Sequence, residues 1–120
     1  MNNERIFKMS FASVYPSYLN KILKKGRTKE ELHEVIFWLT GYDEFQLENV
    51  IANNSNFEYF YSNAPQINPN ATLIKGVICG YRIEDIENSL MKNIRYLDKL
   101  VDELAKGKTL EKIFRKSVNH

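Results

Sequence analysis

Apolar residues recur at every third or fourth position over most of this chain, a spacing that predicts amphipathic helices. The first helix is expected to start close to Pro16, because proline is tolerated in a first helical turn, and to end at Gly26. The second begins with Thr28 and Glu31, whose side chains can each accept a hydrogen bond from the other residue's backbone N–H, and ends at Gly41. Their apolar stripes consist of Leu19, Ile22 and Leu23, and of Leu32, Val35, Ile36 and Leu39.

Two further short helices are expected in the middle of the chain. Asp43 and Gln46 form a second capping pair at the start of one of them. The other is expected to begin at Ser55 and to end at Pro65. Their stripes consist of Leu47, Val50 and Ile51, and of Phe57, Phe60, Tyr61 and Ala64.

The longest periodic segment covers residues 83–107 and ends at Gly107. Its apolar positions step by four and three residues in turn, which resembles a short coiled-coil seam. Asp102 and Lys106 are spaced as a favourable ion pair on its surface, and Thr109 is expected to cap a last short helix. The seam consists of Leu90, Ile94, Leu97, Val101 and Leu104.

Residues 67–86, INPNATLIKGVICGYRIEDI, also favour a helix. An Asn-Pro pair at positions 68–69 is a typical helix start, and the apolar residues at 73–74 and 77–78 form two adjacent rows on a helix face. A half-buried strand would alternate apolar and polar residues instead. A short, fully buried strand over residues 73–81 is the alternative, because its isoleucine and valine residues favour strands.

These elements predict an all-α fold, a compact single-domain bundle of six or seven short helices with orthogonal packing over residues 1–120. No Asn-Gly or Asp-Gly hairpin signal occurs. No apolar run is long enough for a membrane span, and the N-terminus lacks the apolar stretch of a signal peptide. With a single cysteine as well, we expect a cytoplasmic protein without membrane partners.

The net charge of +2 is unevenly distributed. Residues 1–29 carry seven basic residues and one acidic residue, and residues 106–120 carry five and one, whereas residues 30–105 hold 13 acidic and five basic residues. The basic ends could pair with the acidic middle, bind an external anion, or belong to an ordinary solvated surface of mixed sign.

Reactive or metal-binding side chains are scarce. Cys79 is expected to be a small buried packing residue close to a helix end at Gly80, where the helix dipole disfavours a thiolate. His33 has no second internal histidine with which to hold a metal, and the adjacent acids Glu84 and Asp85 fit a solvated helix start. We therefore expect no metal site, no cofactor and no catalytic residue, although an enzymatic role is left open.

A pocket for a small ligand is the second functional hypothesis from the residues. Polar groups and glycines crowd the segment after Asn68, and an arginine there could hold a carboxylate or phosphate through two parallel hydrogen bonds. The expected lining residues are Tyr15, Asn68, Asn70, Arg82 and Tyr96.

Three long blocks of the chain resemble a bacterial family of unknown function, DUF2200. They are FASVYPSYLNKILKKGRTKEELHEVIFWLTGY, FEYFYSNAPQINPNATLIKGVICGYRIEDIE and LMKNIRYLDKLVDELAKGKTLEKI, and the resemblance runs from about Ile6 to about Lys116. It implies a stand-alone helical protein of the bacterial cytosol and no specific activity. The family tends to have Asp-Pro where this chain has Asn88-Ser89, and either residue here can still cap the long helix.

The first functional hypothesis is a helical binding or interaction module that self-associates. Its basis is a surplus of seven tyrosines, which suit interfaces, and a seam that one small domain could leave partly uncovered. A third hypothesis, weak nucleic-acid binding by the basic N- and C-terminal segments, is supported by no recognisable binding motif.

Overall fold

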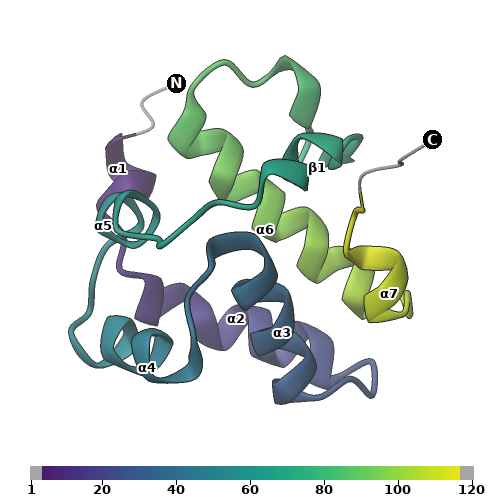
Figure 1. The fold of residues 1–120 in the computed structure, drawn as a ribbon, viewed down its shortest axis with the longest axis horizontal. Coiled ribbons are helices and arrows are strands. Elements are labelled where there is room, and N and C mark those ends of the chain that lie inside the picture. Colours follow the sequence, from purple (N-terminus) through teal and green to yellow (C-terminus); the bar gives the residue numbers. More distant parts are fainter. Residues whose placement is uncertain (1–3, 117–120) are drawn as a thin grey trace.

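The computed structural model describes residues 4–116 of the chain. Within these residues it contains seven α-helices, two short 3-10 helices and one two-stranded antiparallel hairpin (Figure 1). The α-helices are α1 (Glu4–Phe7), α2 (Phe11–Leu23), α3 (Lys29–Thr40), α4 (Glu44–Ala52), α5 (Phe57–Ser62), α6 (Ser89–Ala105) and α7 (Leu110–Ile113). The remaining elements are η1 (Pro69–Leu73), β1 (Val77–Ile78), β2 (Tyr81–Arg82) and η2 (Ile83–Asp85). The predicted all-α bundle of six or seven helices is therefore confirmed.

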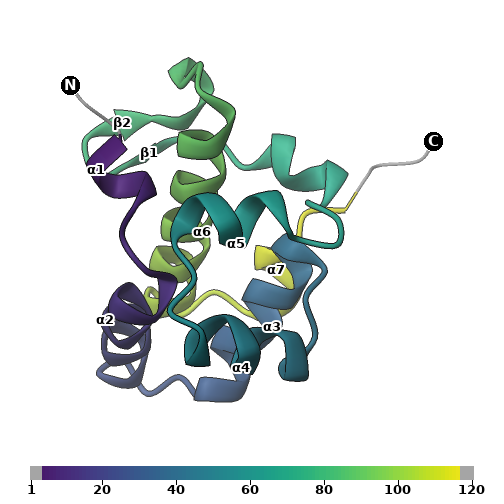
Figure 2. The same cartoon turned by 90° about the vertical axis from the view of Figure 1, so that its left-hand side faces the viewer.

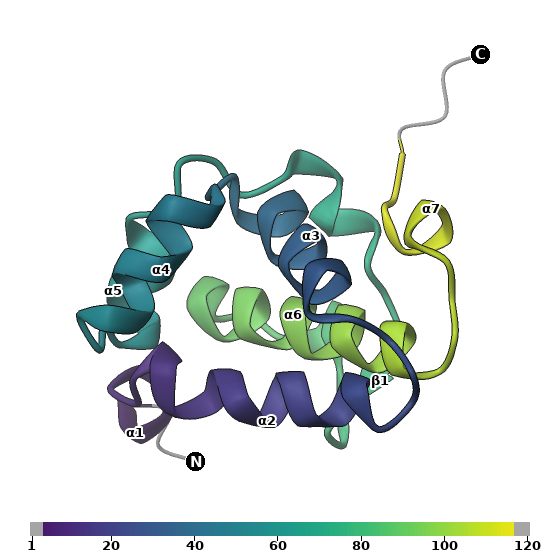
Figure 3. The same cartoon turned by 90° about the horizontal axis from the view of Figure 1, so that it is seen from below.

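Helix α6 is the centre of the bundle. Helix α2 runs beside it and α3 packs against it, while α5 and α7 contact it as well (Figure 3). The aromatic rings of Phe11 and Phe60 stack with centroids 4.1 Å apart and join α2 to α5. Trp38 stacks on Phe114 in the same way, with centroids 5.7 Å apart, and joins α3 to the end of α7. The largest fully buried side chains are Phe11, Phe60, Ile22, Leu32, Ile36, Leu39, Leu47, Ile74, Ile83, Leu97, Leu100 and Leu104.

The predicted seam of α6 is covered by the domain's own helices. Leu97 and Leu104 are fully buried, Ile94 and Val101 are at most 3% exposed, and Leu90 packs against the edge of the core. Because these side chains already have apolar neighbours, the seam offers no free surface to a second copy of the chain.

The capping signals are confirmed where the sequence shows them most clearly. Thr28 and Glu31 form both hydrogen bonds of the capping box at the start of α3, and Asp43 and Gln46 do the same for α4. Asn88 caps α6, since its Oδ1 accepts a hydrogen bond of 2.8 Å from the backbone N–H of Met91. Each such cap stabilises a helix start by about 1 kcal/mol.

Two helix starts differ from the prediction. Helix α2 begins at Phe11 after a Ser10 cap, so Pro16 lies inside the helix and not in its first turn. Helix α5 begins at Phe57, and its cap is Asn56, one residue after the expected start at Ser55. One long-range contact explains both shifts, because Ser10 and Asn56 form an isolated antiparallel bridge. The bridge aligns the two helix starts through tertiary hydrogen bonds that no local pattern encodes.

The helix predicted over residues 67–86 is wrong. Asn68 does cap a helical turn, but η1 ends after Leu73, and the chain then forms the hairpin of β1 and β2, with Val77 opposite Arg82. The hairpin lies against α6 (Figure 2). Val77 is 57% exposed, so the alternative of a fully buried strand is wrong as well.

The turn of this hairpin explains why a helix cannot form there. Cys79 and Gly80 are its two loop residues, and their φ angles of 53° and 81° are those of a type I′ turn. Gly76 precedes the hairpin with φ of 105°, which a residue with a side chain rarely adopts. Cys79 is exposed, so its predicted role as buried packing is also wrong.

The basic ends and the acidic middle pair with each other, one of the three alternatives left open by the charge pattern. Lys21 of α2 contacts Asp102 of α6 at 3.2 Å. Arg115, after α7, donates two hydrogen bonds to the carboxylate of Glu103, which is 4% exposed. The predicted pair of Asp102 and Lys106 also forms, at 2.9 Å. The first two of these pairs help to hold the terminal segments on α6.

Candidate binding site

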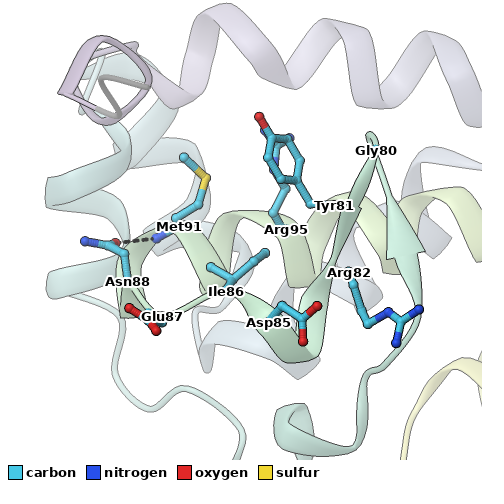
Figure 4. Close-up of a pocket in the computed structure, with 9 residues that line it drawn as sticks. All are labelled: Gly80, Tyr81, Arg82, Asp85, Ile86, Glu87, Asn88, Met91 and Arg95. Carbon is cyan, nitrogen blue, oxygen red and sulfur yellow. Dashed lines mark hydrogen bonds between the residues drawn. The ribbon is translucent and has the colours of Figure 1, made fainter.

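A surface pocket of about 650 Å³ lies where the hairpin and η2 meet the first turns of α6 (Figure 4). Two of the lining segments are held by local structural signals. The Cys79-Gly80 turn sets the hairpin, and the Asn88 cap fixes the start of α6. The lining residues are Gly80, Tyr81, Arg82, Asp85, Ile86, Glu87, Asn88, Met91 and Arg95.

The apolar part of this pocket comes from three different segments. Tyr81 belongs to β2, Ile86 follows η2, and Met91 lies in the first turn of α6. Figure 4 shows these three side chains around the same open space. Their combination of an aromatic ring, a branched side chain and a flexible thioether suits the apolar body of a small molecule.

Arg95 is the most constrained polar group of the pocket. Its side chain is 15% exposed, and its Nη1 donates a hydrogen bond of 2.8 Å to Asp98 Oδ2. The centre of its guanidinium lies 5.1 Å from the centroid of the Tyr81 ring, a cation–π distance. Its Nε is buried and has no hydrogen-bond partner among residues 4–116. Asp98 thus holds one edge of the guanidinium and the Tyr81 ring covers one face, while the edge that carries Nε has a donor without a partner in the described structure.

A buried polar cluster lies behind Arg95 and holds it in place. Asp98 accepts hydrogen bonds from Arg95 and from the hydroxyl of Tyr18, and the Cys79 sulfur lies 3.9 Å from its Oδ2. Burial raises the pKa of Asp98 above its usual range, although Arg95 acts in the opposite direction. Burial and the nearby Asp98 carboxylate raise the pKa of Tyr18 well above 10. The cluster links the hairpin turn, α2 and α6 beneath the pocket.

A second, smaller hollow of about 270 Å³ lies between α4 and α5. Its lining is mostly amide and hydroxyl side chains and includes no charged residue, so it offers no strong anchor for an ion. The lining residues are Tyr42, Gln46, Asn49, Val50, Asn53, Ser55, Tyr59 and Asn63.

The sequence gives no indication of one further cluster, a hydrogen-bonded chain of Tyr15, His33 and Glu44. The Tyr15 hydroxyl contacts His33 Nε2, and His33 Nδ1 lies 2.8 Å from Glu44 Oε1. Burial, and then the charge of Glu44, raise the pKa of Tyr15. Although the order of groups resembles a nucleophile, base and acid, Tyr15 and His33 are at most 9% exposed and line neither pocket. These three hydrogen-bonded side chains therefore form a structural link between α2, α3 and α4.

The five residues predicted to form one ligand site do not come together. Only Arg82 lines the larger pocket, and Figure 4 shows its guanidinium turned away from the apolar side chains. Asn68 donates to the carbonyl of Trp38 and Asn70 donates to the carbonyl of Arg115, so both fasten η1 to its neighbours. The remaining two, Tyr15 and Tyr96, are buried.

The described part of the chain also limits other kinds of site. No group of three or more His, Cys, Asp or Glu side chains in residues 4–116 is placed to hold a metal ion. In the same range, no helix combines the length and the apolar character needed to cross a bilayer.

Comparison with known proteins identifies relatives without an assigned activity. A family model described as "Uncharacterized protein conserved in bacteria (DUF2200)" matches residues 5–115. A solved structure described as "Crystal structure of uncharacterized protein SP1917" is 39% identical, covers 98% of both chains, and superimposes with a TM-score of 0.90. No curated protein matches. These matches establish the family and the fold of the chain. They assign no activity, so function has to be inferred from the residues of the site.

Proposed function

Because the chain belongs to the bacterial DUF2200 family, whose description names no activity, we propose its function from the geometry of its larger pocket. The proposed function is the binding of a small molecule between the hairpin and the start of α6. The observation that carries this proposal is the pocket itself. At about 650 Å³ it falls within the usual range of ligand sites, roughly 300–1,000 Å³.

The composition of the lining supports binding in preference to catalysis. Three apolar side chains can cover the body of a ligand, while charged groups at the edge can orient it. No serine, histidine, cysteine or lysine is among the described lining residues, so these residues offer no Ser-His or Cys-His pair of a nucleophile and its base.

A fragment screen monitored by backbone amide shifts tests the proposal. The expected result is that several small apolar or amphipathic fragments shift the amide signals of residues 80–95 and leave most of α3 unchanged. The variant Ile86→Trp, which puts a larger ring at the pocket, should abolish these shifts. Leu23→Trp, at an exposed position of α2 outside both pockets, is the matched control and should bind fragments as the parent does.

Two outcomes of this screen would contradict small-molecule binding. One is the absence of any fragment that shifts residues 80–95 in a protein that gives a well-dispersed spectrum. The other is unchanged binding in Ile86→Trp, which would place the fragments elsewhere on the surface.

Self-association is the second candidate function, favoured by apolar side chains that the fold leaves exposed. Phe45 of α4 is 71% exposed and Tyr59 of α5 is 53% exposed. Sedimentation velocity from about 1 to 300 µM tests this candidate, since specific interfaces of standard size commonly give complexes at micromolar or lower concentration. A dimer that is lost in Phe45→Ser would support it, and a monomer over the whole range would exclude it. Nucleic-acid binding is not proposed, because Lys21 and Arg115 of the basic ends already pair within the domain.

A further inference from the structure

We infer that the ligand of the larger pocket is a small zwitterion with an apolar body, such as an α-amino acid with a large apolar side chain. Its carboxylate would bind the unused edge of Arg95, and its ammonium group would lie beside Asp85 and Glu87. This inference rests on the proposed small-molecule function and specifies the chemistry of the ligand.

The first step of the argument is the unsatisfied Nε of Arg95. A guanidinium has five N–H donors, and a buried donor without a partner is costly, so native structures rarely keep one. Nη1 is already used by Asp98, whereas Nε has no partner in the described structure. The N–H of Nε and one N–H of Nη2 point in the same direction, and this pair matches the two oxygens of a carboxylate.

The second step is that Arg95 is held ready for such a group. Asp98 holds the opposite side of the guanidinium, and the Tyr81 ring lies over its face. The Nε atom is buried, so a carboxylate reaches this edge once the Tyr81 ring turns aside. Because the arginine itself is already fixed, binding would cost little additional entropy of the arginine side chain. A planar anion that approaches in the guanidinium plane is therefore favoured over a spherical one.

The third step concerns the acidic side of the pocket. In Figure 4 the carboxylates of Asp85 and Glu87 lie along one edge of the pocket and Arg95 along the other. Both acids are exposed, and neither takes part in an ion pair within residues 4–116. A ligand that carried only negative charge would meet repulsion there, whereas an ammonium group on the same ligand would be attracted.

The fourth step is the apolar body of the ligand. Ile86 and Met91 line the pocket beside the acidic edge, the Tyr81 ring lies over Arg95, and none of the three side chains carries a charge. A side chain of the size of leucine, methionine or phenylalanine can cover them, and the pocket volume leaves room for it.

The test compares three forms of one compound by titration into the isotope-labelled protein. L-phenylalanine carries both charges, L-phenylalaninamide lacks the carboxylate, and N-acetyl-L-phenylalanine lacks the ammonium group. The same three forms of L-leucine and L-methionine are run in parallel, so that a poor fit of one side chain does not decide the outcome. The free amino acid of at least one set should shift residues 80–95 with an affinity about tenfold or more above both of its derivatives, since hydrogen bonds to charged groups are strong.

Variants assign the two charged edges. Arg95→Lys keeps a cation beside Asp98 but removes the two-donor edge, and should weaken binding of the free amino acid about tenfold or more. Arg5→Lys, the same change at an exposed position of α1 outside both pockets, is the matched control and should change this affinity less than about twofold. The double variant Asp85→Asn, Glu87→Gln should weaken the free amino acid and leave the N-acetyl form unchanged or tighter.

The outcomes separate this inference from the proposed function. An amide that binds as tightly as the free amino acid, or an N-acetyl form that does so, would overturn the inference while small-molecule binding stands. The same holds if none of the nine compounds binds but uncharged fragments still shift residues 80–95. If no compound or fragment of any kind shifts those residues, both proposals fail. The comparison of ligand forms uses the unaltered protein, so it decides the matter even if Arg95→Lys does not fold.

Discussion

Two regions of this molecule are specified in very different ways. The helical frame of α2, α3, α4 and α6 carries its own start and stop signals, such as the box of Thr28 and Glu31. The connector, residues 67–88, carries few such signals. Its backbone conformation depends on contacts with the frame. Lys99 of α6, for example, donates to the carbonyl of Val77 at 3.3 Å. The larger pocket lies where the two regions meet. The part of the chain with the fewest local structural signals therefore supplies most of the residues of the candidate site.

The largest expected contrast between the two regions is in packing. Leu97→Ala removes a fully buried side chain at the centre of α6 and should lower the free energy of unfolding by about 2–5 kcal/mol. Val77→Ala shortens a side chain that is 57% exposed on the hairpin and should change the free energy of unfolding by less than about 0.5 kcal/mol. Urea unfolding followed by circular dichroism measures both.

Similar losses in the two variants would break this contrast. Such a result would mean that the hairpin is as strongly coupled to the core as α6 itself, and that the connector is not the less stable region.

The second prediction concerns tyrosines, most of which the frame buries. Burial raises the pKa of Tyr42 to about 12, and it raises the pKa of Tyr61 well above 10. A phenol with a raised pKa keeps its proton longer in the folded state, so the folded state binds more protons between pH 10 and 12. The free energy of unfolding should therefore fall as the pH rises toward this window, by about 1–1.5 kcal/mol between pH 8 and pH 11 for Tyr42 alone.

Tyr42→Phe should reduce this loss at alkaline pH. At neutral pH the same variant should cost about 1 kcal/mol, because it removes the hydrogen bond from Tyr42 to the carbonyl of Phe60. Val77→Ala, which removes no titratable group from the connector, is the control and should keep the pH dependence of the parent. Unfolding curves at pH 8, 10 and 11 measure the effect, and an unchanged slope in Tyr42→Phe would contradict the assignment.

The frame could be predicted from the sequence because its signals are local. A capping pair such as Asp43 and Gln46 acts within one helical turn, and an apolar stripe needs only the helix period. The starts of α2 and α5 were misplaced because the Ser10–Asn56 bridge joins residues far apart in the chain. Periodicity also predicted the α6 seam correctly, yet it could not show that neighbouring helices cover it.

The connector and the site could not be predicted for the opposite reason. Apolar pairs at 73–74 and 77–78 fit a helix, but Gly76 and Gly80 occupy conformations that only tertiary structure reveals. Of the expected site residues, Arg82 lines the larger pocket, because it lies in the segment that forms this pocket. Arg95 was missed, since its orphaned Nε depends on burial and on the position of Asp98.

The third prediction compares two caps of the same kind, one in each region. Thr28→Ala removes the cap of α3, far from the pocket, and Asn88→Ala removes the cap of α6, which also lines it. Each should lower the free energy of unfolding by about 1 kcal/mol. Only Asn88→Ala should also shift the amide signals of the pocket residues. A loss at Asn88 much smaller than at Thr28 would show that the connector, and not the cap, fixes the start of α6.

The smallest predicted effect tests whether Cys79 is unfavourable in the backbone conformation that the hairpin turn requires. Cys79 has φ of 53° at the first loop position of a type I′ turn, where asparagine is strongly preferred. Since the left-handed conformation costs an ordinary residue roughly 1 kcal/mol, Cys79→Asn should raise the free energy of unfolding by about 0.5–1 kcal/mol. Cys79→Val, whose branched side chain tolerates positive φ poorly, should lower it. If Cys79→Asn instead lowered stability, the contact between the Cys79 sulfur and Asp98 would outweigh the backbone cost, and the turn would be held by the polar cluster under Arg95.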